Sequence, residues 1–353
     1  MLCFIQKKIF QYKIKQSLNN KLYISDREHQ LNALKDLLNK LSIVLEIASN
    51  YNFINNFLEY VKSYLIDKSI AINSDILIVG SNAKLNVRIN GANYLSQGKQ
   101  VISICHGEHS SYVLDEPVIG HTEISYCSDY ITYGISQNFN TLKYAKSLYI
   151  LPIIHYKSSK VIKSFYEDNL INKIQLEESN ILYIPTAFSA NKRYGPFRDI
   201  EDNLYKKWQN SILSLDYNIT YKAHPKNNIE VNLKSHKTEQ KNLQEVLLDY
   251  DFYILDYIST ASALCVATDK PIIYFNIGMR NMTEEVLKLF KKRVFWVDID
   301  MNKDFSIQIK QAISDYTNLK QDFINEYTEK YSLANYNKSE IEILEEVTRG
   351  KRV

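Results

Sequence analysis

Residues 250–275, YDFYILDYISTASALCVATDKPIIYF, contain two apolar runs separated by a polar turn and a run of small residues. The first run, 252–255, has the composition of a buried strand, and a second strand is predicted at 271–275. The segment between them has the length of the helical crossover that parallel strands require, and we expect its helix at 261–267. The stretch therefore predicts a parallel β–α–β unit, the building block of α/β folds.

The polar turn in this stretch places Asp256, Ser259, Thr260 and Ser262 where a strand ends and a helix begins. Unpaired backbone N–H groups and the positive end of the helix dipole favour an anion at such a point. The same residue types are typical of an ordinary helix N-cap, in which Ser259 or Thr260 accepts a hydrogen bond from the first turn. The turn alone leaves both interpretations open.

The overall composition is that of an ordinary soluble globular protein. The chain has 353 residues, a length typical of two domains, with 45% hydrophobic and 24% charged residues. A net charge of +3 is too small to indicate nucleic-acid binding. The four cysteines lie far apart without a C-x-x-C spacing, so neither a zinc site nor a disulfide framework is expected, and a reducing cytoplasm fits.

The sequence contains no run of about 18 apolar residues, so no transmembrane helix is predicted and we expect a cytoplasmic protein. The amino-terminal residues lack the apolar core and cleavage site of a secretory signal. Basic segments at 7–15 and 288–293 leave open a peripheral contact with the inner face of the cell membrane, although a solvated face is the simpler interpretation.

The first half of the chain predicts a second β–α–β unit. Residues 27–68 carry apolar positions at helical spacing, and 75–79 and 100–105 have the continuous apolar composition of buried parallel strands. The second of these strands delivers His106 and Gly107 to its carboxyl end, where ligands bind in α/β sheets. Glycine allows a sharp turn and close approach of a ligand, and imidazole can donate to a phosphate or accept a proton. A loop histidine bonded to a neighbouring carbonyl is the alternative.

The polar loop at 108–123 follows this strand and carries several carboxylates. A loop of this length in a compact domain is usually functional or mobile. We expect one carboxylate to act as a general base, with Glu108 as the first candidate and Glu123 as the second, and the others to be solvated. Further strands are predicted at 128–134 and 148–154.

The second half predicts another parallel sheet, after a polar segment at 156–180 that we interpret as the linker. Three of its strands end in polar side chains, and a basic loop follows the first of them. Because the carboxyl ends of parallel strands lie along one edge of a sheet, these groups are expected to converge. The candidate binding residues are Thr186, Arg193, Lys222, His224, Pro225, Ser259, Thr260 and Ser262.

These side chains have the chemistry of a phosphate-binding site. Charge-assisted hydrogen bonds from imidazole and lysine are strong, and a helix end with cations supplies a positive field without a metal. We therefore predict no metal site. Two doubly wound domains that face each other across a cleft suit group transfer, because one can hold an activated donor while the other positions the acceptor and its base.

Together the motifs resemble those of bacterial two-domain GT-B transferases of surface polysaccharide and teichoic acid assembly. The similarity is strongest to the CDP-glycerol:polyglycerophosphate glycerophosphotransferase group and to related capsule transferases of the Kdo and sialic-acid type. It covers about residues 75–275. In the first half, CHG at 105–107 matches that group's QHG turn, and SDYITYG at 128–134 matches its aD-x-hhh-x-G strand. In the second half, ILYIPT at 181–186 matches ILY-x-PT, and KAHP at 222–225 matches K-x-HP. The last match is DYIST at 256–260 with KPII at 270–273, for D-Y-S-S … KPII.

The resemblance implies that His224, Ser259 and Thr260 hold the phosphates of a cytidine-activated donor, that Lys222 assists, and that His106 lies near the acceptor. It implies a GT-B glycosyltransferase that moves a sugar from a CMP- or CDP-linked donor to a growing surface glycan. Its partners would be the nucleotide-sugar and a glycan or lipid-linked acceptor, and it would need no cofactor. Transfer of glycerol or ribitol phosphate is one alternative, and an inactive GT-B domain that serves as a binding subunit is the other.

The predicted domains are an acceptor-side domain with a helical amino-terminal region at 1–165, a donor-binding domain at 175–335, and a helix and tail at 336–353. One further motif, Asp298-Ile299-Asp300, matches the D-x-D that binds a metal–nucleotide in another transferase fold. It has no supporting context, and we interpret it as a solvated strand end.

Overall fold

The computed structural model describes a defined part of the chain, and the structural statements that follow concern that part. The described residues are 32, 35, 36, 74–81, 83–105, 107, 120–133, 152–157, 160–167, 176–186, 202–224, 237–319, 324–333 and 337–349. The helices expected at 27–68 therefore lie almost entirely outside the described residues.

The chain divides into two compact units. The first comprises Met1–Ile104, Gly120–Tyr130 and Lys143–Ile153, and the second comprises Cys105–Ile119, Ile131–Leu142 and Ile154–Val353. The described strands form two sheets, one of four strands and one of six. Helices lie between the first two strands of the four-stranded sheet and between most successive strands of the six-stranded sheet, so the predicted α/β class is confirmed.

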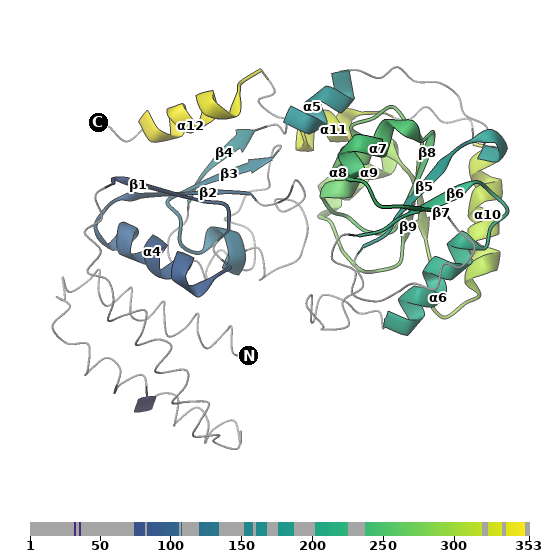
Figure 1. Ribbon diagram of the computed structural model, residues 1–353, viewed down its shortest axis with the longest axis horizontal. Coiled ribbons are helices and arrows are strands. Elements are labelled where there is room, and N and C mark those ends of the chain that lie inside the picture. The colour runs from purple at the N-terminus through teal and green to yellow at the C-terminus, as the bar shows by residue number, and fades with distance from the viewer. Residues whose placement is uncertain are drawn as a thin grey trace. The chain divides into compact units, whose positions relative to one another are not determined.

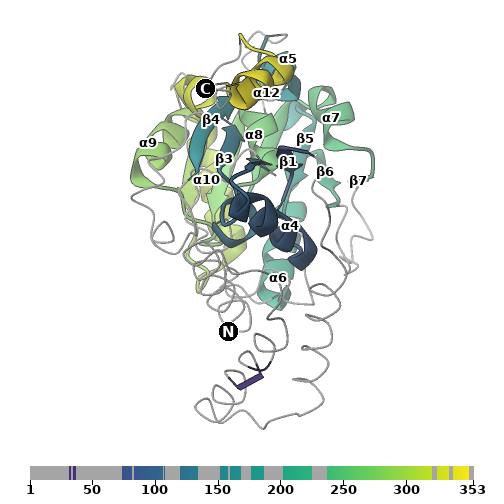
Figure 2. The ribbon, with the colours of Figure 1, turned by 90° about the vertical axis from the view of Figure 1, so that its left-hand side faces the viewer.

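The four-stranded sheet has the order β1-β2-β3-β4. Its strands are β1 (Ile76–Val79), β2 (Gln100–Ile104), β3 (Asp129–Tyr133) and β4 (Ile153–Lys157). Strands β1 and β2 are parallel, and helix α4 (Leu85–Ser96) packs against both (Figure 1 and Figure 2). Gly91 lets α4 approach the segment before β3, because a Cβ atom at that position would lie 3.0 Å from the Tyr126 carbonyl oxygen.

The six-stranded sheet is parallel throughout and has the order β10-β9-β8-β5-β6-β7. Its strands are β5 (Ile181–Ile184), β6 (Ile219–Lys222), β7 (Lys237–Glu239), β8 (Phe252–Leu255), β9 (Ile272–Asn276) and β10 (Phe295–Asp298). When the strands are numbered from β5 along the chain, their order is 3-2-1-4-5-6, which is that of the Rossmann fold. The chain adds strands on one side of β5 as far as β7, and then adds β8 and the later strands on the other side, so the strand order reverses between β5 and β8.

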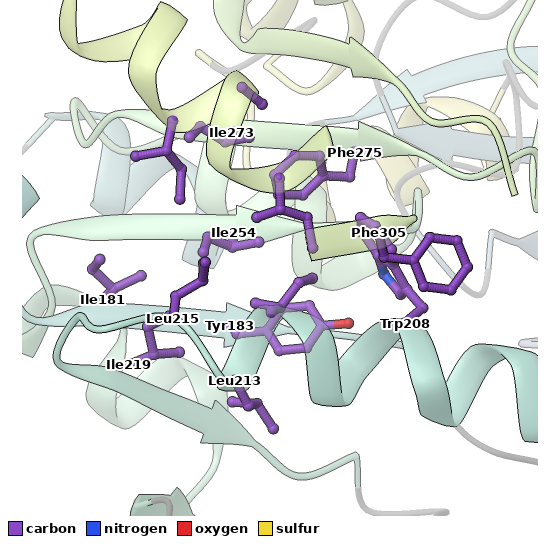
Figure 3. Packing of buried hydrophobic residues seen from close by; sticks show 14 of the residues in the cluster. Ile181, Tyr183, Trp208, Leu213, Leu215, Ile219, Ile254, Ile273, Phe275 and Phe305 are labelled. Atoms are coloured by element: carbon purple, nitrogen blue, oxygen red, sulfur yellow. The ribbon is translucent and has the colours of Figure 1, made fainter. Parts of the chain in front are cut away.

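Both faces of this sheet are buried, and successive residues of each strand alternate between them. Tyr183 and Phe275 point to the face covered by α6 (Asp202–Leu213) and α10 (Phe305–Thr317), where Phe305 packs against Trp208 (Figure 3). The Trp208 ring meets Phe275 and Phe305 edge-on, with centroids at 5.3 and 5.4 Å.

The opposite face of the six-stranded sheet is covered by α8 (Thr260–Val266) and α9 (Glu284–Arg293) (Figure 1). Here Tyr274 meets the ring of Phe290 edge-on at 5.3 Å. The continuous apolar composition of strands such as ILYI and FYIL follows from this burial on two sides. The second sheet is therefore doubly wound, as the sequence predicts.

Two elements lie where the sequence predicts no regular structure. The supposed linker at 156–180 contains the end of β4 and helix α5 (Lys160–Glu167), whose buried Ile162 and Phe165 face inward as it packs on α8. The edge strand β7 has no apolar signal, because its lysine, threonine and glutamate are largely exposed. The remaining described helices are α7 (Leu243–Val246), α11 (Glu326–Tyr331), α12 (Glu340–Arg349) and three single turns at Gly120–Ile124, Leu176–Glu178 and Leu247–Asp249.

The carboxyl end of α8 is held by a buried arginine from α9. The guanidinium of Arg293, which is 2% exposed, donates to the carbonyl oxygens of Val266, Thr268 and Lys270. Burial lowers the pKa of Arg293 to about 10. The planar fork of donors satisfies carbonyls that the end of a helix leaves without intrahelical partners.

We expect Arg293→Met to lower the free energy of unfolding by about 3 kcal/mol, because the substitution removes a buried cation that donates to the Thr268 and Lys270 carbonyls, while the Val266 carbonyl keeps its bond from Thr328. The matched control is Lys288→Ala on the exposed side of the same helix, for which a change within about 0.5 kcal/mol is expected. Urea unfolding of the two variants measures the difference. Equal losses in both would contradict the role of Arg293 at the end of α8.

Candidate functional site

The candidate site lies at the carboxyl edge of the six-stranded sheet. Strands β5 and β8 are neighbours there, with Ile184 opposite Leu255, and they are the pair at which the strand order reverses. Ligands of open α/β sheets bind at the carboxyl ends of strands at this switch point. Thr186 follows β5 and Asp256 follows β8, so the sequence prediction that these two strand ends lie together is confirmed.

Asp256 is the most extensively bonded side chain at this edge, and it is 1% exposed. Its Oδ2 atom accepts hydrogen bonds from the Tyr183 hydroxyl at 2.5 Å and from Trp208 Nε1 at 3.1 Å. The hydroxyl of Tyr205 lies 3.1 Å from Oδ1 and 3.2 Å from Oδ2. The carboxylate therefore joins β8 to β5 and to α6, in agreement with a residue that orients the turn.

Burial raises the pKa of Asp256 from its ordinary value of 3.8 to about 6. The three side-chain donors act in the opposite direction, because hydrogen bonds to the ionised carboxylate stabilise it. The pKa values of Tyr183 and Tyr205 are raised, first by burial and then by the neighbouring carboxylate. Both phenols therefore stay protonated and act as donors.

Thr186 is held through its backbone. Its N–H donates to the Tyr205 hydroxyl at 3.0 Å, and the residue is buried at the end of β5. Since Tyr205 also contacts Asp256, a single phenol links the residue that follows β5 to the residue that follows β8.

The turn after β8 forms a complete helix cap. The Ser259 side chain accepts from the Ala261 N–H at 3.2 Å, and the Ser262 hydroxyl accepts from the Ser259 N–H at 2.8 Å. Ser262 is buried and also donates to the Ser259 carbonyl. The N-cap interpretation is therefore confirmed, with Ser262 as its inner member. Ser259 and Thr260 are half-buried, and their contact with a donor phosphate stays a prediction.

Lys222, predicted to assist in phosphate binding, is directed into the protein. It is 6% exposed, and its ammonium donates to the carbonyl oxygens of Ala223 at 3.1 Å and Glu239 at 3.4 Å. Burial lowers its pKa. Because Glu239 ends β7, the lysine joins the ends of β6 and β7. His224 follows β6 at the same edge and is half-buried.

Arg280 is a cation at this edge that the sequence analysis does not identify. It follows β9, where Gly278 adopts a left-handed φ of 76° that favours glycine. The Arg280 Nη1 atom donates to the Ile258 carbonyl at 2.5 Å, and its guanidinium stacks on the Tyr257 ring at 4.4 Å. The arginine thus lies against the turn between β8 and α8. The sequence signal for Arg280 is a glycine turn that follows a parallel strand and is itself followed by a cationic side chain.

In the first unit, the second base candidate Glu123 lies in the π-helical turn Gly120–Ile124. It is 6% exposed, and its Oε2 atom accepts from the Tyr130 hydroxyl at 2.7 Å. Burial first, and then Asp129 and Glu123, raise the pKa of the adjacent Cys127 thiol. A carboxylate enclosed in this way is poorly placed to take a proton from an acceptor, and its role as general base stays a prediction.

Several predicted residues lie outside the described part of the chain. They are His106, Glu108, Arg193 and Pro225.

The D-x-D carboxylates bond to nearby protein groups. Asp298 Oδ1 accepts from Asn276 Nδ2 at 2.8 Å and from Trp296 Nε1 at 2.9 Å, and Asp300 is paired with Lys303 at 3.3 Å. Across the described ranges, no group of three histidine, cysteine, aspartate or glutamate side chains is arranged to hold a metal ion. Within the same ranges, no helix has both the length and the apolar character needed to cross a membrane.

No family model matches the chain, and no curated protein sequence matches it. A glycosyltransferase from Rickettsia africae ESF-5 is similar in structure, with 13% identity and a TM-score of 0.44 over 83% of this chain and 78% of that chain. TarM is similar with 12% identity and a TM-score of 0.41 over 81% of this chain and 57% of its own.

The raised pKa of Asp256 predicts how stability depends on pH. A carboxyl whose pKa rises on folding stabilises the folded state below its unfolded pKa, and this contribution is lost as pH rises through about 6. From about pH 4 to pH 7, the wild type should lose up to about 3 kcal/mol relative to Asp256→Asn, which does not titrate. Urea unfolding of both proteins across this range measures the difference. Parallel pH curves would show that Asp256 has an ordinary pKa.

Proposed function

We propose that this protein is a metal-independent glycosyltransferase that moves a sugar from a CMP- or CDP-linked donor to a surface glycan or a lipid-linked acceptor in the cytoplasm. The donor would bind at the carboxyl edge of the six-stranded sheet. The acceptor and the base would come from the first half of the chain, where the resemblance to GT-B transferases puts His106.

One observation carries the proposal: the parallel 3-2-1-4-5-6 strand order, with its switch point between β5 and β8. This architecture commonly binds nucleotides at that point. Three of the motifs that resemble the transferase group end the adjacent strands β6, β5 and β8 of this sheet. The order of these motifs in the sequence and the adjacency of their strands in space support the same site.

In this site we assign the donor phosphate to His224, Ser259 and Thr260, with Thr186 at the end of β5. Arg280 adds a positive charge beside the turn, while Lys222 maintains the ends of β6 and β7. Cationic and hydroxyl donors of this kind stabilise negative charge that develops on a leaving phosphate.

The proposed reaction is a substitution at the anomeric carbon of the sugar. A carboxylate, Glu108 by preference, accepts the proton of the acceptor hydroxyl. The acceptor oxygen then forms a bond to the anomeric carbon, while the bond from that carbon to the donor phosphate oxygen breaks. The electron pair of the broken bond remains on the phosphate of the released nucleotide, where the cationic groups stabilise it.

A thermal-shift titration with CMP, CDP, UDP and GDP tests the proposed donor. A ligand that binds only the folded protein stabilises it by RT ln(1 + [L]/Kd), about 2.7 kcal/mol at a concentration of 100 Kd. We expect CMP or CDP to raise the Tm and the other two nucleotides to have little effect. A shift with CDP-glycerol that exceeds the shift with CMP and CDP would favour polyol phosphate transfer, and no shift with any of them would favour a binding subunit.

His224→Ala tests the assignment of the phosphate contact. Loss of a charge-assisted hydrogen bond should weaken CDP binding by about 10- to 100-fold, because such bonds contribute about 1.5–3 kcal/mol. The matched control is His155→Ala on β4, which lies in the other sheet and should bind CDP as the wild type does. Isothermal titration of the wild type, His224→Ala and His155→Ala gives the ratios of their Kd values for CDP. Equal affinity in the wild type and His224→Ala would exclude this contact.

A further inference from the structure

We propose that Tyr205 is a positioning residue for the donor site, because it fixes the residue after β5 relative to the residue after β8. The proposal rests on the proposed function, since it concerns the same nucleotide-binding edge. Tyr205 lies in the first part of α6 and belongs to none of the sequence motifs.

The geometry of Tyr205 differs from that of an ordinary core tyrosine. The residue is completely buried, and its hydroxyl is within hydrogen-bonding distance of both Asp256 carboxylate oxygens, at 3.1 and 3.2 Å. The same hydroxyl accepts the N–H of Thr186 at 3.0 Å. A phenol can donate one hydrogen bond and accept another, so Tyr205 has the two functions that this arrangement requires.

These two contacts span the switch point of the sheet. Thr186 is the second residue after β5, and Asp256 is the first residue after β8 and directly precedes the turn that leads to Ser259. A donor held between these two strand ends needs both of them in place at once, and a displacement of about 1 Å at such a site is enough to reduce binding and rate. The Tyr205 hydroxyl contacts the backbone of Thr186 after β5 and the carboxylate of Asp256 after β8.

Tyr183 provides an internal comparison. It is equally buried and donates to the same carboxylate, at 2.5 Å, but from within β5. Loss of its hydroxyl removes a donor to Asp256 and leaves the contact of Tyr205 with Thr186 intact. Tyr253 on β8 provides a second comparison, because its buried hydroxyl donates to the Leu247 carbonyl at 2.7 Å and does not contact Asp256 or Thr186.

The test compares Tyr205→Phe, Tyr183→Phe and Tyr253→Phe, each of which removes one buried hydroxyl from the complete chain. For each variant, isothermal titration measures the Kd for CDP, urea unfolding measures stability, and hydrogen exchange measures the protection of the Thr186 amide. We expect Tyr205→Phe to weaken CDP binding at least tenfold and to accelerate exchange of the Thr186 amide. Tyr183→Phe should weaken binding by threefold or less, and Tyr253→Phe should bind CDP as the wild type does, although all three lose stability.

The outcomes separate positioning from stability. If CDP affinity falls in proportion to stability across the three variants, or if Tyr205→Phe binds CDP as the wild type does, Tyr205 is not a positioning residue. If wild-type protein binds neither CMP nor CDP, the proposed function fails, and the positioning of a nucleotide donor by Tyr205 fails with it. In that case the exchange of the Thr186 amide still decides whether Tyr205 holds the end of β5.

Discussion

The buried carboxylate of Asp256 is the constraint on which the carboxyl edge of the second sheet depends. An ionised carboxylate is costly to bury unless donors surround it, and here the donors are Tyr183, Tyr205 and Trp208. One donor comes from the neighbouring strand and two come from α6, so strand β8 can end in this position only when β5 and α6 are also in place. The same requirement positions the turn at 257–259 that follows Asp256, and with it the candidate donor site.

The residues at this edge divide into those that maintain it and those exposed enough to contact a ligand. Ser262 completes the helix cap, and Lys222 bonds to carbonyls at the ends of β6 and β7. Ser259, Thr260 and His224 are half-buried. Within the cap, the Ser259 side chain accepts from the Ala261 N–H and Ser262 accepts from the Ser259 N–H, while Ser259 and Thr260 border the surface.

The secondary structure of the second unit was largely predictable because its strands are short apolar runs between polar turns. The strand at 252–255 was predicted with the bounds that the structure has. Strand β7 was missed because an exposed edge strand of three polar residues has no hydrophobic pattern, and α5 was missed because its two buried side chains lie in a charged segment. Of the site, the motif residues could be found from their positions after strands. Arg280 and Tyr205 could not, because their roles depend on contacts with residues 22 and 51 positions away.

By itself the sequence determined the α/β class, most of the strands in the second unit and the strand ends that carry polar side chains, because these depend on local composition and period. The tertiary structure decided the rest. Strand order is set by the packing of faces far apart in sequence, and only this order makes β5 and β8 neighbours at the switch point. Whether a polar side chain points to a ligand or into the protein also depends on its surroundings. Lys222, which the sequence predicts as a phosphate ligand, bonds to carbonyl oxygens of the protein, and Arg280, which no motif indicates, lies against the turn between β8 and α8.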